Sequence, residues 1–422
     1  MRLIKTFAAV LALVLAFPSV AVAGNTDLTR GDIALRHVEF INDHLYGRIT
    51  FTYRELETTQ WIVQELAAMG HDPENITVQE FYFDYQQLWF SPRGRLFHMA
   101  AFSDEPFCME AAADIIREML LESGLPESME REIREYIAKN FPAALGNMIF
   151  DAVLNEIVDS VLDDELERTL YLLQQFDVFG EQDFRNVSQN VILTVPGQSS
   201  QTIIAAAHYD SVKFSGASDN ASGMALMLES AYHMLALDNY YTIVYVFFGG
   251  HELGLLGGYY FLDSLSQQAQ DEILFIINAD VLFEGPYLFF GTGILEDDYI
   301  GENEISERIA NIALYVNESA DTELIFEAEL ARMPGEQRLF LDEGHTVLAF
   351  SGFARVEPDN QYTSHSFSQE TSIGLVGGRV LHTPRDDFHY IEYNWPGKME
   401  TALRTFSVFL ENVLTARFTE LS

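Results

Sequence analysis

The feature that most constrains the fold is an alternation of short apolar runs with helical windows from Asn190 onward. Residues 203–207, 242–248 and 273–277 are continuously apolar, which is typical of strands buried on both faces of a parallel sheet. Helical periodicity follows in windows such as 221–237. This order predicts an α/β protein: a doubly wound, mostly parallel sheet with helices on both faces.

Residues 104–175 have a different character, with almost no strand pattern and several helical windows rich in Glu and Asp. We interpret them as a helical insertion within one domain that spans residues 24–422. Two roles are open for it. It forms either a plain surface bundle or a lid over an active site, since long insertions in hydrolase folds often control access.

Residues 1–23 have the pattern of a secretory signal peptide. Arg2 and Lys5 precede an apolar run over residues 7–17, and Ala21-Val22-Ala23 forms a small-x-small cleavage site. A membrane anchor is the alternative, but the run is shorter than the ~20 residues that a spanning helix needs. We therefore expect a secreted or periplasmic protein with no membrane association after cleavage. The single cysteine excludes an intramolecular disulfide.

The composition excludes two classes of protein. With 64 acidic against 24 basic residues, the formal net charge is −40. Such a field repels phosphates, so nucleic acid is not an expected partner. The 48% hydrophobic content is too high for a disordered acidic chain.

Polar residues follow the three apolar runs directly or within a few positions. His208, Glu252 and Asp280 stand there, and ligands of open α/β sheets bind outside the carboxyl ends of the strands. Asp219, in a loop of small residues, and His382 are candidates for the same crevice. Two histidines and three carboxylates suit a borderline metal such as zinc.

Other hydrolase signatures fail. His251-Glu252 does not begin an H-E-x-x-H motif, because position 255 is Leu. Ser218 is not in G-x-S-x-G, because position 220 is Asn.

Taken together, the motifs resemble those of the M28 metallopeptidases in order and spacing. The resemblance covers residues 190–390, extends more weakly over 45–70, and is absent from the insertion. The motifs that carry it are His208-x-Asp210, Gly216-Ala217-x-Asp219-Asn220-Ala221-Ser222-Gly223, Glu252-Leu253-Gly254-Leu255-Leu256-Gly257, Asn278-x-Asp280 and His382-Thr383-Pro384-x-Asp386.

The resemblance implies a catalytic centre with two zinc ions. Asp219 would bridge the ions, His208 and Asp280 would complete one, and Glu252 and His382 would complete the other. Asp210 would orient His208 from behind.

The chain departs from the family at position 251. The family usually has Glu-Glu there, the first being the general base, whereas this chain has His251-Glu252. Three interpretations are open: His251 is the base, it binds metal or substrate, or the site is inactive and kept for binding. An imidazole with an ordinary pKa near ~6.5 is able to act as a base at neutral pH.

A second departure is Thr363-Ser364-His365, where the family often has Ser-Asp-His. His365 either contacts substrate or is hydrogen-bonded beneath the site.

The resemblance implies an exported zinc-dependent exopeptidase that acts on peptides or proteins, in the first place an aminopeptidase. A water activated by two zinc ions would cleave the peptide bond, with His251 as base. The alternatives are a carboxypeptidase-like or glutaminyl-cyclase-like activity, and a catalytically silent zinc-binding protein that captures peptides or partners.

Overall fold

The computed structural model describes residues 28–82 and 187–417, apart from 213, 253, 286, 297–298, 302–303, 334, 354, 357–360, 363–379 and 382. The predicted signal peptide and the predicted insertion over 104–175 lie outside the described residues. So do two candidate site residues, His365 and His382.

The described strands form one nine-stranded sheet in the order β1-β2-β4-β3-β5-β9-β6-β7, with β8 paired to β6. Pairing is parallel from β4 through β3 and β5 to β9, and antiparallel along the path outside that centre. The strands are β1 (Ile76–Tyr82), β2 (Val187–Val195), β3 (Ser199–His208), β4 (Tyr241–Phe248), β5 (Ile273–Ala279), β6 (Tyr287–Glu296), β7 (Tyr299–Gly301), β8 (Ile325–Phe326) and β9 (Val347–Phe353). A separate ribbon pairs β10 (Arg355–Val356) with β11 (Gln361–Tyr362).

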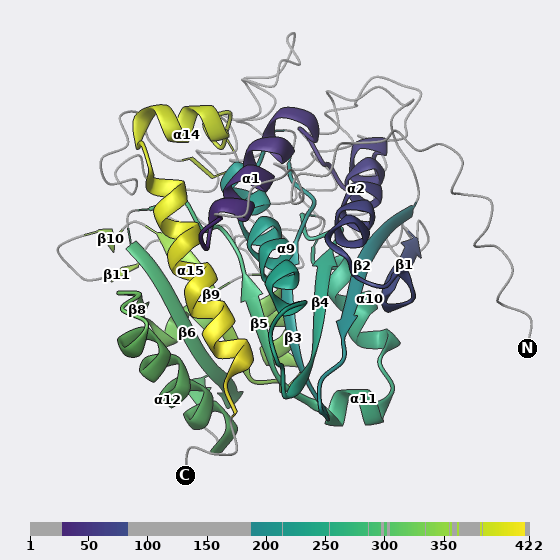
Figure 1. Ribbon diagram of the computed structural model, residues 1–422, viewed down its shortest axis with the longest axis vertical. Coiled ribbons are helices and arrows are strands. Elements are labelled where there is room, and N and C mark those ends of the chain that lie inside the picture. The colour runs from purple at the N-terminus through teal and green to yellow at the C-terminus, as the bar shows by residue number, and fades with distance from the viewer. Residues whose placement is uncertain are drawn as a thin grey trace, which may run out of the picture.

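Helices cover both faces of the sheet. One core includes side chains of α1 (Asp32–His44), α2 (Tyr53–Met69), α9 (Ser222–Met234), α12 (Glu304–Ser319) and α15 (Lys398–Thr415). The other includes side chains of α10 (Leu256–Ser264) and α13 (Glu336–Asp342). In Figure 1, α1, α9 and α15 lie side by side across the near face of the sheet. The shorter helices are α11 (Gln267–Asp271) and α14 (Phe388–Asn394).

The alternation along β3 shows why both faces need a cover. Ile203, Ala205 and Ala207 pack into the first core, whereas Ile204 and Ala206 pack into the second. Because side chains alternate across a strand, a continuously apolar strand is stable only between two apolar layers. The predicted doubly wound α/β sheet is confirmed, with its parallel pairing concentrated at the centre.

The turn after β4 delays the next helix, because α10 begins only at Leu256. Gly254 (φ 92°) and Leu255 (φ 62°) both adopt left-handed backbone, which an α-helix cannot contain. The turn that results presents residues 251 and 252 at the end of β4 before the chain becomes helical.

Candidate metal centre

Three candidate residues meet at the carboxyl edge of the parallel strands. His208 ends β3, Asp280 follows β5 directly, and His251 lies three residues beyond β4. These strands are neighbours, so their carboxyl ends share one edge. One ligand atom from each of the three residues lies within 4.8 Å of the others. The sheet thus gathers potential metal ligands that are far apart in sequence.

His208 is the buried centre of this group. Its Nε2 lies 3.1 Å from Asp219 Oδ1 and 3.3 Å from Asp280 Oδ1, and its Nδ1 lies 3.1 Å from the Asp210 carbonyl oxygen. Burial lowers the pKa of His208, but the carboxylates of Asp210, Asp219 and Asp280 outweigh it and raise the pKa well above its ordinary value. The carboxylates therefore create a strong local demand for positive charge.

These donors fit zinc. Bonds of ~2.0–2.2 Å around a tetrahedral ion place neighbouring ligand atoms about 3.3 Å apart. The two separations from His208 Nε2, 3.1 and 3.3 Å, each match that spacing, and the three residues whose ligand atoms all lie within 4.8 Å of one another are His208, His251 and Asp280. An imidazole nitrogen and two carboxylate oxygens are also zinc's ordinary ligand types. A cation here would relieve the repulsion between Asp219 and Asp280.

The loop that carries Asp219 is held by Asp386. Its carboxylate accepts the backbone N–H of Ser218 (2.5 Å) and of Asp219 (3.1 Å). Burial, with added repulsion from Asp219, raises the pKa of Asp386 to about 8. The peptide bond between Asp219 and Asn220 is cis, and the Asn220 side chain donates to the Ala279 carbonyl at the end of β5. These contacts fix the loop against the strand edge.

Asp210 connects the ends of β3 and β4. Its carboxylate accepts the backbone N–H of His251 (3.1 Å) and of Glu252 (3.0 Å) and the hydroxyl of Thr50 (2.7 Å). The carboxylate lies 3.5 Å from His208 Nδ1, farther than the Asp210 carbonyl. Burial opposes ionisation, yet the bonds from His208 and Thr50 keep the pKa of Asp210 below its usual value. Besides facing His208, Asp210 anchors the turn that bears buried Glu252.

A buried arginine lies beneath the site. Arg48 is fully buried and donates to the carbonyls of Tyr209 (2.7 Å), Ser215 (2.7 Å) and Gly216 (3.2 Å). Burial lowers the pKa of Arg48 to about 10, so the guanidinium remains charged at neutral pH. The nearby carboxylates of Asp386 and Asp210 stabilise that charge. Arg48 therefore both shapes the loops after β3 and offsets the negative charge above it.

His251 is held between a ring and a carboxylate. Its imidazole stacks on that of His208, with centroids 3.6 Å apart and planes 8° from parallel. Its Nδ1 lies 2.8 and 2.7 Å from the two carboxylate oxygens of Glu336, the first residue of α13. Both side chains are buried.

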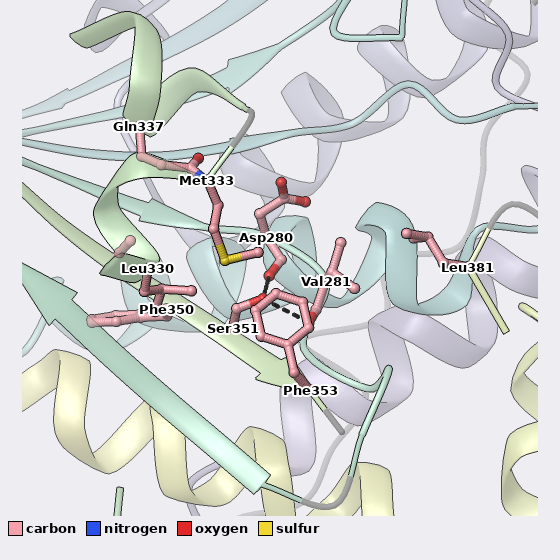
Figure 2. A pocket seen from close by; sticks show the side chains of 10 residues that line it. Asp280, Val281, Leu330, Met333, Gln337, Phe350, Ser351, Phe353 and Leu381 are labelled. Carbon is pink, nitrogen blue, oxygen red and sulfur yellow. Dashed lines mark hydrogen bonds between the residues drawn. The ribbon is translucent and has the colours of Figure 1, made fainter. Parts of the chain in front are cut away.

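An apolar pocket opens beside Asp280. Its lining includes Leu330, Met333, Phe353 and Leu381, and Figure 2 shows them around the stem of Asp280. Ser351 donates to the backbone carbonyl of Asp280 at 2.6 Å, which fixes the turn after β5. The site therefore has a polar edge, suited to a metal, next to a wall suited to an apolar group.

Sequence patterns did not indicate four of the residues that shape the site. Arg48, Thr50 and Glu55 precede the insertion and lie in no recognisable motif. Glu55 accepts the Phe51 N–H and the Ser188 hydroxyl, and burial raises its pKa well above the ordinary value. Glu336 lies in a segment with no clear helical period.

An α/β sheet with histidine and acidic side chains gathered at its carboxyl edge suits a metal-dependent hydrolase. The chain belongs to peptidase family M28, whose family model matches residues 190–407. The expected family is confirmed, and it implies a metallopeptidase that acts on peptides.

Similar proteins agree with this assignment. Aminopeptidase YwaD of Bacillus subtilis is 48% identical over 63 residues, which are 15% of this chain and 14% of that protein. Matches to the curated relatives cover 14 to 37% of their lengths.

Two solved structures share the fold. A zinc aminopeptidase from Bacillus subtilis superposes with a TM-score of 0.54 at 15% identity, over 92% of this chain and 94% of that one. A glutaminyl cyclase from an Acidobacteriales bacterium gives 0.50 at 13% identity, over 93% and 97%.

Proposed function

We propose that this protein is an exported aminopeptidase that uses two zinc ions. Asp219 would bridge them, with His208 and Asp280 on one ion and Glu252 and His382 on the other. The observation that carries the proposal is the meeting of acidic groups with His208 at the strand edge, where its Nε2 lies 3.1 Å from Asp219 and 3.3 Å from Asp280. Membership of the M28 family and similarity to aminopeptidases support it.

Zinc, when bound, supplies a Lewis acid that polarises the scissile carbonyl and makes water acidic. The protein's own part is proton transfer and orientation. His251 takes a proton from the attacking water as its oxygen bonds to the carbonyl carbon. It returns the proton to the amine nitrogen when the C–N bond breaks. Asp210 keeps the turn of residues 251–252 in place through two backbone bonds.

The site favours a substrate with a free N-terminus and an apolar first side chain. The apolar wall of Leu330, Met333 and Phe353 would contact that side chain. Acidic groups at the edge of the sheet would attract the α-ammonium group. His365 stays a candidate for a further substrate contact.

The test is hydrolysis of aminoacyl chromogenic substrates with added zinc, by wild type, His251→Ala and His251→Glu. We expect activity in the wild type on leucyl or methionyl substrates, and its loss in His251→Ala. An inactive wild type with an active His251→Glu would show that the site is kept for binding. Metal analysis that finds no zinc in the purified protein would contradict the proposal altogether.

A glutaminyl-cyclase-like reaction is a second candidate, because the fold superposes on a cyclase over most of both chains. The products separate the two reactions. Cyclisation of an N-terminal glutamine releases ammonia and converts the first residue into a ring without shortening the peptide, whereas the peptidase releases a free amino acid. Mass spectrometry of a Gln-Leu peptide and a Leu-Gln peptide therefore distinguishes them.

Export is part of the proposal and is tested separately. Among the described helices, none is long and apolar enough to cross a bilayer. We expect the mature protein, expressed with its own N-terminus in a bacterial host, to begin at Gly24. N-terminal sequencing of protein from the medium or periplasm measures this, and an uncleaved N-terminus would contradict it.

A further inference from the structure

The contact between His251 and Glu336 has a role beyond packing. Glu336 is 0% exposed and His251 is 5% exposed, so water is not available to satisfy either group fully. Both carboxylate oxygens lie within 2.8 Å of the same ring nitrogen, Nδ1. A buried carboxylate that meets an imidazole at this range costs desolvation, so the pair is retained only where the surroundings hold both partners in place.

The chemistry of the contact defines the tautomer. An ionised carboxylate only accepts hydrogen bonds, so Nδ1 of His251 carries the hydrogen and donates it to Glu336. Nε2 is therefore the nitrogen of His251 that accepts a proton in the site. The same relation between a carboxylate, an imidazole and its far nitrogen makes a histidine an oriented base in serine hydrolases.

The surrounding structure fixes Glu336 as firmly as His251. The next residue, Gln337, accepts the side-chain N–H of Asn278 at the end of β5 (2.6 Å). Gly258 of α10 leaves room for α13, because a Cβ there would lie 2.8 Å from Leu339 and 3.4 Å from the Glu336 stem. The start of α13 is thus tied to the ends of two strands, β4 through Glu336 and β5 through Gln337.

From this geometry we infer that Glu336 is a positioning residue that acts through His251, and that the two together replace the single glutamate usual at position 251 in the family. Here the carboxylate of Glu336 lies behind the imidazole of His251, and the imidazole acts on the substrate in place of the family's glutamate. Glu336 sets the ring's orientation and tautomer and does not itself touch the substrate. Only the kinetic test of this inference rests on the proposed peptidase function.

The kinetic test is a double-mutant cycle on a leucyl substrate with zinc added. Glu336→Gln places an amide where a carboxylate is needed, and its –NH2 group favours the wrong tautomer. We expect kcat to fall about 10²- to 10⁴-fold with KM changed little. Glu336→Asp should recover part of that loss. Glu343→Gln, the same chemical change at an exposed position just after α13, should leave kcat unchanged.

The decisive comparison uses the His251→Glu background. If Glu336 acts through the imidazole, adding Glu336→Gln there causes no loss, because two buried carboxylates that repel each other are reduced to one. A residue that only supports the fold would cost the same in both backgrounds. Equal losses in wild-type and His251→Glu proteins would overturn the inference.

A second readout does not depend on activity. Nitrogen-15 NMR of labelled histidines, with the His251 signals assigned by their absence in His251→Glu, reports the tautomer in metal-free and zinc-loaded protein. We expect hydrogen on Nδ1 in wild type and a change of tautomer in Glu336→Gln. A wild-type signal with hydrogen on Nε2 would sink the inference. If no variant hydrolyses any substrate, the proposed function fails while this measurement still decides the role of Glu336.

Discussion

The two sides of the candidate centre are built in different ways. On the motif side, formed by His208, Asp210, Asp219 and Asp386, the two supporting carboxylates of Asp210 and Asp386 accept backbone N–H groups of nearby loops. On the dyad side, formed by His251 and Glu336, the ring nitrogen Nδ1 of His251 contacts the carboxylate of Glu336, from a helix 85 positions later. Backbone bonds tolerate many sequences, whereas a side-chain pair fixes two residue identities at once. The motif side should therefore control metal binding, and the dyad side turnover.

The largest expected effect tests the motif side directly. Asp219→Ala removes the proposed bridging ligand and leaves His208 facing one carboxylate fewer. We expect zinc to be lost and kcat/KM to fall on the order of 10⁴-fold, the scale on which enzymes respond to loss of an essential group. Metal analysis and kinetics measure both. Asp263→Ala, an exposed change on α10, is the control. Full zinc content in Asp219→Ala would refute this division of roles.

The support beneath the motif side is tested by Arg48→Met. This change keeps an unbranched apolar stem but leaves the carbonyls of Tyr209, Ser215 and Gly216 without their donor, and buried carboxylates without a nearby cation. We expect the free energy of unfolding to fall by about 3–5 kcal/mol, as when one partner of a buried ionic group is removed. Urea unfolding measures it. Arg54→Met, which removes a half-exposed surface arginine, should cost under about 1 kcal/mol.

The link between the two sides is Asp210, which bonds to the backbone of His251 and Glu252. Asp210→Asn replaces one acceptor oxygen with a donor that faces N–H groups. We expect zinc affinity to fall about 10- to 100-fold, the usual cost of losing support behind a ligand. Competition with a fluorescent chelator measures the affinity. Asp271→Asn, exposed on α11, serves as control. A drop in kcat at unchanged zinc affinity would assign Asp210 to the dyad side instead.

The smallest expected effect lies on the dyad side. Gly258→Ala places a methyl 2.8 Å from Leu339 Cδ2 and 3.4 Å from Glu336 Cγ, so the start of α13 has to adjust. Because Leu339 is a flexible side chain, we expect only about 1 kcal/mol of destabilisation. Turnover should fall about tenfold at full zinc occupancy, since small misplacements of reacting groups are costly. Tyr259→Ala, exposed on the same helix, controls for the change in α10. Zinc loss in Gly258→Ala would erase the distinction between the sides.

Sequence patterns predicted the sheet and the motif side better than the dyad side. The strands β3, β4 and β5 were predictable because each is a continuous apolar run ending near a polar residue. His208 and Asp280 were predictable as candidates because strand ends meet at one edge, and Asp219 because it lies in a family-like loop of small residues. Glu336 was not, because its helix is only seven residues long and its partner lies 85 positions away. A buried side-chain pair leaves no periodic trace in sequence.

The buried arginine has a consequence for how the working unit is delimited. Arg48, Thr50 and Glu55 precede residue 83, whereas the family match begins at residue 190. A shortened protein that began near residue 187 would keep the predicted ligands and lose the groups that hold their loops. It would also lose β1 and expose the edge of β2. The family motifs thus identify the candidate ligands, whereas residues 48–55 hold the loops that carry them.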